Sequence, residues 1–173
     1  MKTKHLLCFL FLAAVYPNEF NEVKIENISS TRVLSIAQDS AGFIWIGTDD
    51  GLNRFDGLQN KVYRSDVFDE ATISGNRIWK IHVDKSNTTW ALTDRGVCYY
   101  DALRDQFKRI ETKSRPQHIQ DEKNTLFVST LNHGIYAINK ETKSFKNYLF
   151  DPLDPFSISS SKFSALQAKP TAI

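Results

Sequence analysis

Cysteine is scarce in this sequence. Among 173 residues only Cys8 and Cys98 occur, and Cys8 lies in an apolar stretch near the N-terminus. If that stretch is removed as a signal, no intrachain disulfide can form, which excludes a disulfide-stabilised secreted domain. Cys98 falls inside an expected strand, which favours a buried structural thiol over the alternative, one half of a Cys–His catalytic pair.

An excess of charge of one sign is also absent. The chain has 22 Lys and Arg against 20 Asp and Glu, spread along its length, for a net charge of +2. No basic stripe that could neutralise a phosphate backbone is present. We therefore expect no nucleic-acid partner.

Long apolar runs are missing after the first 16 residues. The one run, residues 6–16, is eleven residues long and follows Lys2 and Lys4. That layout is typical of a secretory signal peptide and is too short to span a bilayer, with a buried strand or helix as the alternative. We therefore expect a signal peptide at 1–16, a lead-in at 17–27, an exported chain, and no membrane segment beyond the signal.

What the sequence does contain is an internal repeat. When the chain is shifted by 45 residues against itself, identical residues meet at five positions of one motif. The pairs are Asp39 and Asp84, Trp45 and Trp90, Thr48 and Thr93, Gly51 and Gly96, and Asp56 and Asp101. A third copy, 37 residues further on, carries Asp121, Phe127, Thr130 and, after one extra residue, Gly134. We expect repeats at 28–72, 73–114 and 115–157, and the start of a fourth at 158–173.

Each repeat indicates short strands separated by turns. One turn position carries Gly or Asn, which tolerate the positive φ that a tight hairpin needs, and a second carries only Gly. The first set is Gly42, Asn87 and Asn124, and the second set is Gly51, Gly96 and Gly134. No period of 3.6 residues is present, so a helical or leucine-rich solenoid is not favoured.

The aromatic positions of the repeat indicate how the strands pack. Trp45, Trp90 and Phe127 point to one face of their strand and aliphatic residues point to the other, so both faces are apolar. We expect the three aromatics to be equivalent wedges between neighbouring sheets. The predicted fold class is all-β, a partial β-propeller with about three four-stranded blades plus the start of a fourth.

Chemical motifs are lacking in the most unusual stretch, "GFIWIGTDDGLNRFDG". A phosphate loop would need Lys followed by Ser or Thr at the start of a helix, and a strand follows here instead. Asp49, Asn53 and Asp56 supply only part of a calcium loop, and the histidines have no metal-ligand spacing. We expect no catalytic residues, no metal and no cofactor.

The run "IAQDSAGFIWIGTDDGLNRFDG" resembles the regulator-propeller repeat of two-component sensors, and "SISSSKFSALQ" resembles the linker that opens the next repeat. The resemblance extends from about Ile25 to Gln167. In that family a signal peptide precedes many such blades, followed by a β-sandwich, a membrane helix and a histidine kinase. Its members sense oligosaccharides in the periplasm and switch on polysaccharide-utilisation genes.

The resemblance implies that this chain is the N-terminal fragment of a periplasmic sensor and not itself an enzyme. The sequence ends inside the start of a fourth repeat, and its tail "AKPTAI" leaves the pattern. The implied partner is an oligosaccharide bound by the full-length sensor, with a homodimeric parent anchored in the inner membrane. The alternative is an exported stand-alone propeller that binds or scaffolds, or a fragment of a polysaccharide lyase.

Three loops that recur at one place in the repeat are the candidate ligand site. Their polar residues are Asp49, Asp50, Asp94, Arg95, Asn132 and His133. A sugar site generally pairs an aromatic platform with several hydrogen-bonding groups, and these loops carry no aromatic. We therefore expect the platform to come from other blades, so that the isolated chain binds no oligosaccharide measurably while the full-length periplasmic region does. The alternative is that the loops only cap hairpins.

Overall fold

The structure, a computed structural model, describes residues 24–162, and within them it forms strands and turns without any helix. The strands are β1 (Val33–Gln38), β2 (Ile44–Thr48), β3 (Gly51–Phe55), β4 (Asn60–Tyr63), β5 (Ile78–Val83), β6 (Thr89–Thr93), β7 (Gly96–Asp101), β8 (Gln106–Glu111), β9 (Pro116–Glu122), β10 (Thr125–Thr130), β11 (Ile135–Asn139) and β12 (Phe145–Tyr148). The predicted signal peptide, most of the lead-in and the end of the chain lie outside the described residues.

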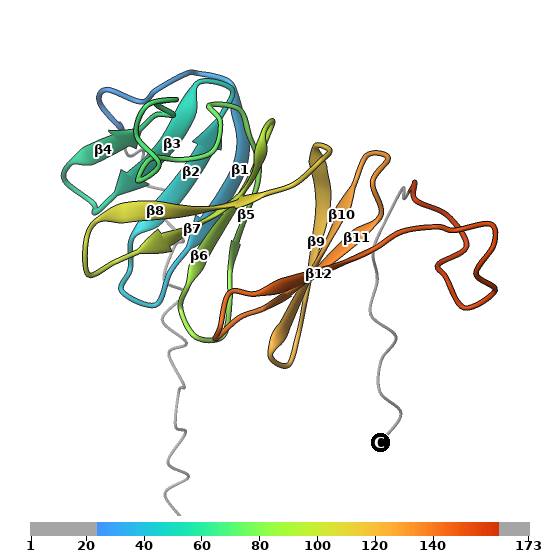
Figure 1. Cartoon of the computed structure of the whole chain (residues 1–173). Coiled ribbons are helices and arrows are strands. Elements are labelled where there is room, and N and C mark those ends of the chain that lie inside the picture. Colours follow the sequence, from blue (N-terminus) through green and yellow to red (C-terminus); the bar gives the residue numbers. More distant parts are fainter. Residues whose placement is uncertain (1–23, 163–173) are drawn as a thin grey trace, which may run out of the picture.

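The strands form three four-stranded antiparallel sheets, each built from consecutive strands in sequence order. The sheets follow one another around a common axis like the sectors of a fan (Figure 1). Their first strands lie closest together, because β5 contacts both β1 and β9. This confirms the all-β, propeller-like fold class. The sheets fall at 33–63, 78–111 and 116–148, inside the three predicted repeats.

The first two hairpins are closed by the repeated aspartate. Asp84 follows β5, and its Oδ1 accepts the N–H groups of Ser86 and Thr88 at 2.9 Å each. Its Oδ2 accepts the indole N–H of Trp90 at 2.8 Å. Asp39 makes the same three kinds of bond after β1, including one of 2.8 Å from the indole of Trp45. Both predicted turn residues have positive φ, 92° at Gly42 and 62° at Asn87.

The third hairpin differs from the prediction. Its positive φ, 49°, belongs to Lys123 and not to Asn124. Asp121 lies inside β9 opposite Leu126, in the register position that Val83 holds in the second sheet. The loop is one residue shorter here, so an alignment at a fixed spacing places Asp121 wrongly.

Asp121 instead links the third sheet to the second. Its carboxylate accepts a hydrogen bond from Lys140 Nζ at 2.6 Å and lies 3.3 Å from His82 Nε2 on β5. Burial alone raises the pKa of Asp121, but the bonds from Lys140 and His82 outweigh it and lower the pKa. The Phe at position 127 lacks the indole N–H that would otherwise need this acceptor.

The turn that has glycine in all three repeats is also only partly as predicted. Gly51 and Gly134 have φ of 137° and 72°, whereas Gly96 does not have a positive φ. At Gly96 the constraint is space, because a Cβ there would lie 3.1 Å from the carbonyl oxygen of Ile110. At the far end of the same strands, Asp56 and Asp101 accept backbone N–H groups and close the β3–β4 and β7–β8 turns.

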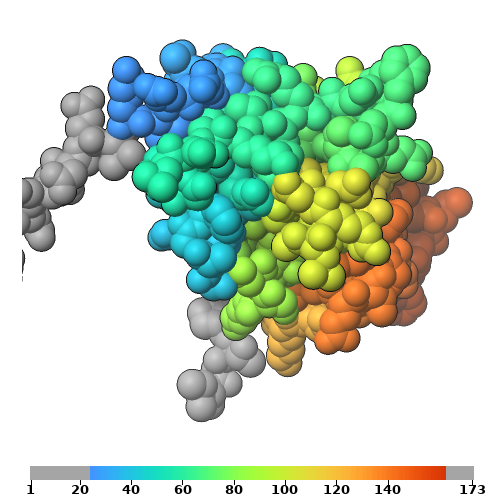
Figure 2. Space-filling view, turned by 90° about the vertical axis from the view of Figure 1, so that its left-hand side faces the viewer, coloured from blue at the N-terminus to red at the C-terminus, as the bar shows by residue number. Residues whose placement is uncertain are grey.

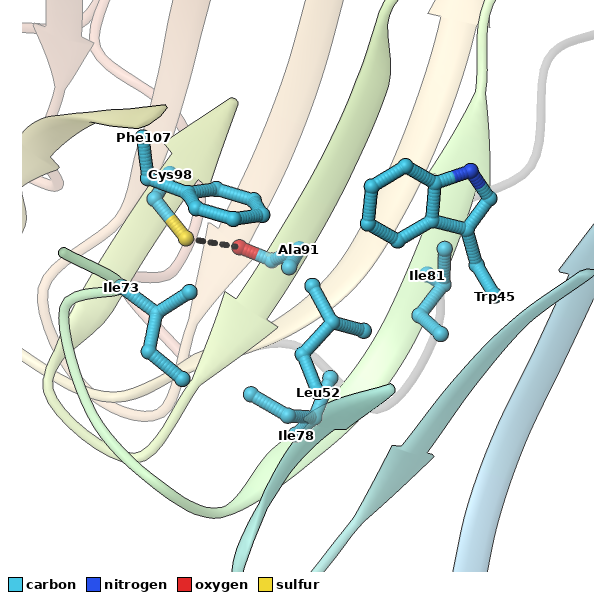
Figure 3. Close-up of a cluster of buried hydrophobic side chains, with 8 residues drawn as sticks. All are labelled: Trp45, Leu52, Ile73, Ile78, Ile81, Ala91, Cys98 and Phe107. Carbon is cyan, nitrogen blue, oxygen red and sulfur yellow. Dashed lines mark hydrogen bonds between the residues drawn. The ribbon is translucent and has the colours of Figure 1, made fainter. Parts of the chain in front are cut away.

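The core lies between the sheets. Figure 3 shows one buried cluster, in which Trp45 and Leu52 of the first sheet pack beside Ile81 of the second. Trp90 occupies the equivalent place in a second cluster, between the second and third sheets. Phe127 is only half-buried, because no described sheet covers its face. The two tryptophans are wedges between sheets as predicted, whereas for Phe127, which adjoins no further sheet within the described residues, the wedge role stays a prediction.

Cys98 lies in the first of these clusters and is fully buried. Its thiol is directed at the carbonyl oxygen of Ala91, 3.8 Å away, as the dashed line in Figure 3 marks. Burial raises the pKa of Cys98 to about 11. The prediction of a buried structural thiol is confirmed.

The segment between β4 and β5 fastens the first sheet to the second along the outer edge. Phe107 N–H donates to the Ala71 carbonyl at 2.8 Å. The Arg109 guanidinium donates to the carbonyl oxygens of Asp66, Asp69 and Thr72 at 2.8 or 2.9 Å. In Figure 2 this green segment lies against the yellow residues of the second sheet.

Within the described residues there is no helix that could cross a membrane.

Candidate functional site

The three predicted loops lie beside the starts of the innermost strands. Gly51 N–H donates to the carbonyl of Asn76 at 2.7 Å, and Asp94 N–H donates to the carbonyl of Arg77 at 3.1 Å. Both acceptors come just before β5. The third loop repeats this beside β9, where Leu131 N–H donates to the carbonyl of Arg115 at 2.9 Å. The loops therefore share one end of the sheets.

A buried threonine fixes the backbone of each loop. The Thr48, Thr93 and Thr130 side chains are fully buried. Each hydroxyl accepts an N–H from the loop at 3.0–3.1 Å, and each donates to the glycine carbonyl that follows at 3.0–3.1 Å. The turn is closed by the threonine, so it does not need the side chains of the six candidate residues.

The candidate side chains make separate contacts. The Asp50 carboxylate pairs with Arg64 at 3.1 Å, with both side chains about half exposed. Asn132 Oδ1 accepts from the Ser114 hydroxyl at 2.6 Å. His133 Nε2 is shielded from solvent and has no partner among the described residues. Asp49 lies half-buried in its turn.

The second loop is the most open of the three. Asp94 Oδ1 accepts the Arg77 N–H at 3.3 Å, while Arg95 is exposed. Both line a hollow of about 240 Å³ together with Val67 and Asn76. No cluster of His, Cys, Asp and Glu within residues 24–162 could hold a metal ion.

The same end of the molecule carries an aromatic side chain that the sequence analysis overlooked. Trp79 on β5 lies between two arginines, with the Arg77 guanidinium carbon 4.0 Å and the Arg115 carbon 4.8 Å from its ring centroid. Trp79, Arg115 and His118 line a hollow of about 260 Å³ with Pro116 and Gln117. The expectation that any platform must come from other blades did not take Trp79 into account.

A repeated signal in the sequence could have pointed to this cluster. Arg32, Arg77 and Arg115 each stand just before the innermost strand of their sheet. Only the second of them is followed, two residues later, by a tryptophan. In β5 the pairing with β6 shifts between Ile78 and Lys80, so Trp79 is the extra residue of a β-bulge. Bulges re-aim a side chain, and here the bulge turns the ring toward the arginines.

Comparison with known proteins agrees with the fold. The family described as "Two component regulator propeller" matches residues 27–50. Histidine kinase P4 of Formosa agariphila is 46% identical over 50 residues, which is 29% of this chain and 4% of that protein.

Solved structures of extracellular domains from putative hybrid two component systems resemble this chain. The extracellular domain of the putative hybrid two component system BT3049 from B. thetaiotaomicron is 28% identical, with a TM-score of 0.61, over 70% of this chain and 19% of that one. The corresponding domain of BT4673 from the same organism is 28% identical, with a TM-score of 0.56, over 68% and 19%. This chain thus spans less than a fifth of each structure. Residues 27–50 thus match the two-component regulator propeller model, and the chain is similar to the extracellular domains of putative hybrid two-component systems.

Proposed function

We propose that the chain forms part of the periplasmic ligand-sensing region of a hybrid two-component histidine kinase, and that its ligand is an oligosaccharide. The observation that carries the proposal is the likeness, at 28% identity and over about 70% of the chain, to extracellular domains of hybrid two-component systems. The parent protein would be anchored in the inner membrane and would switch on genes for polysaccharide use. The chain itself would bind and not catalyse.

The arrangement of the loops supports a binding role at one end of the sheets. Three loops that are each closed by a buried threonine present different side chains, among them Arg95 and Asn132. Such loops on a rigid scaffold are the usual carriers of recognition, because their side chains vary while the turn is kept. A ligand long enough to touch several loops would also bridge several sheets.

The proposal is tested by titrating a panel of oligosaccharides into the full 173-residue chain and measuring heat by calorimetry. We expect one class of glycan to bind saturably, and Arg95→Gln to weaken its binding. Arg104→Gln is the matched control, because Arg104 is an exposed arginine of the same sheet at the opposite end, in the β7–β8 turn. Binding by no glycan, or an equal effect of both variants, would count against the proposal.

A further inference from the structure

The cluster around Trp79 has many hydrogen-bond donors and few acceptors. An arginine has five N–H donors and no acceptor, and the indole is a donor only. Within the described residues no carboxylate lies within 4.0 Å of the charged groups of Arg77 or Arg115. The Arg77 Nε–H and the Trp79 Nε1–H are shielded from solvent and have no acceptor among residues 24–162.

Both arginines are held in place by contacts other than an ion pair to any described residue. The guanidinium carbons of Arg77 and Arg115 lie 4.0 and 4.8 Å from the centroid of the Trp79 ring, a cation–π contact that helps to hold each group in place. Backbone bonds fix both residues at the same time, from the loop N–H of Asp94 to the Arg77 carbonyl and from that of Leu131 to the Arg115 carbonyl. Arg115 itself is exposed beside the hollow that Trp79 lines.

We propose that Arg115 and Trp79, with the positive charge of Arg77 beside them, form a binding site for one anionic group, a carboxylate or a sulfate ester of an oligosaccharide. Oxygens of either group match the fork of an arginine, and charge-assisted bonds of this kind are stronger than neutral ones. The hollow of about 260 Å³ is small for a ligand pocket, so it takes one charged unit of a longer chain and not the whole ligand. The saccharide part rests on the proposed function, whereas the anion part rests on these three side chains.

The site also explains why the arginine before β1 differs from the other two. Arg32 stands at the same place in its repeat as Arg77, but the bulge residue of β1 is Leu34 and not a tryptophan. A guanidinium with no aromatic ring beside it is not held in one orientation by a cation–π contact. Arg32 is exposed and lines no part of the Trp79 hollow. It therefore serves as the matched control.

The test is a calorimetric titration of the full chain with three tetrasaccharides of defined chemistry. One is a galacturonic acid tetramer, the second is its methyl ester, in which the charge is removed, and the third is a sulfated galactose tetramer. We expect the wild-type chain to bind the acid or the sulfated tetramer at least about tenfold more tightly than the ester. Which of the two anions binds more tightly identifies the charged group.

The variants separate a specific site from general attraction. Arg115→Gln should weaken binding of the anionic tetramer by about tenfold, and Arg32→Gln, which removes the same charge, by less than about twofold. Trp79→Phe keeps the ring and should retain most of the affinity, whereas Trp79→Leu should lose it. Thermal melts of each variant confirm that it is folded, and about 0.5 M NaCl should weaken the binding of the wild-type chain.

Three results would overturn the inference. They are binding of the ester as tightly as of both anionic tetramers, equal effects of Arg115→Gln and Arg32→Gln, and no binding of either anionic tetramer. If the ester binds as tightly as both anionic tetramers and Arg115→Gln leaves the binding of all three unchanged, the anion site is wrong while the proposed oligosaccharide function stands. If the wild-type chain binds no glycan, the result would count against both the anion site and the proposed oligosaccharide function.

Discussion

Asp105 connects the first and second sheets, and its replacement by asparagine should destabilise the chain measurably. Its Oδ1 accepts the hydroxyl groups of Tyr63 and Tyr100 at 2.6 Å each and lies 3.4 Å from the Arg54 guanidinium. Lys61 contacts the other oxygen. Tyr63, Lys61 and Arg54 belong to the first sheet, whereas Asp105 and Tyr100 belong to the second. Asn keeps the shape and tolerates the positive φ of 54° at this position, so Asp105→Asn removes the charge and replaces the oxygen that contacts Lys61 by an NH2 group.

The cost can be worked out from the contacts. A hydrogen bond to a charged group contributes about 1.5–3 kcal/mol and a neutral one about 0.5–1.5 kcal/mol. Losing the charge should therefore cost about 1 kcal/mol for each of the two tyrosine bonds. The two ion contacts add less, since the Asp105 side chain is 38% exposed. We expect a total near 2 kcal/mol, or a melting temperature lower by about 4–8 °C for a chain of this size.

The assay is urea unfolding of the full chain followed by tryptophan fluorescence. The matched control is Asp50→Asn, because Asp50 also pairs with an arginine but does so at the exposed surface, with neither tyrosine present. That control should cost less than about 0.5 kcal/mol. If both variants cost the same, the tyrosine network does not strengthen the contact between the sheets and the reasoning is refuted.

The same residue predicts a dependence on pH. Burial alone raises the pKa of Asp105, but hydrogen bonds from Lys61, Tyr100 and Tyr63 outweigh it and hold the pKa well below its ordinary value. A carboxyl group whose pKa is lowered by folding stabilises the fold above its unfolded pKa and loses that effect as the pH falls. The gap in stability between the wild type and Asp105→Asn should be constant above about pH 5 and should shrink below about pH 4.

Three further perturbations follow from the packing and the turns. Trp45→Ala should cost roughly 3–5 kcal/mol in urea unfolding, and Phe127→Ala clearly less, because Phe127 is only half-buried. Cys98 should react with a disulfide reagent far more slowly in the folded chain than in urea, since its thiol is buried and its pKa is raised to about 11. Gly42→Ala should cost only about 1 kcal/mol, from the positive φ alone, because a Cβ there meets nothing within 4 Å. Gly134→Ala should prevent a normal β10–β11 hairpin, because a Cβ there would clash with the Tyr148 carbonyl oxygen, and it should cause a large loss of melting temperature. Similar losses at the two glycines would contradict the last of these.

The repeat predicted the sheets because each repeated residue has a structural role within its own hairpin. Asp84 and Trp90 recur with Asp39 and Trp45 at one spacing because one carboxylate must close the hairpin and accept the indole N–H together. Such a pair is visible in a sequence without any tertiary information. The register, the turn at Asn87 and the burial of both tryptophans all follow from it.

The departures come from changes that a fixed spacing cannot detect. A loop one residue shorter moved Asp121 into β9, where it meets Lys140 and His82 instead of an indole. Phe127 occupies a wedge position in its strand, but its burial depends on which sheet stands next to it. Trp79 was missed because a β-bulge, and not the alternation of side chains along β5, decides where its ring points.

The two ends of the sheets divide structural and recognition roles between different side chains. At the end with Asp39 and Asp84, the acidic side chains themselves close the hairpins, so replacing them breaks the turn. At the other end a buried threonine closes the turn through its hydroxyl, which leaves the side chains of residues such as Arg95 free of that duty. A repeat can therefore change its loop residues there without losing the hairpin. Recognition is expected at the threonine end for that reason, and Trp79 with its two arginines lies at that end.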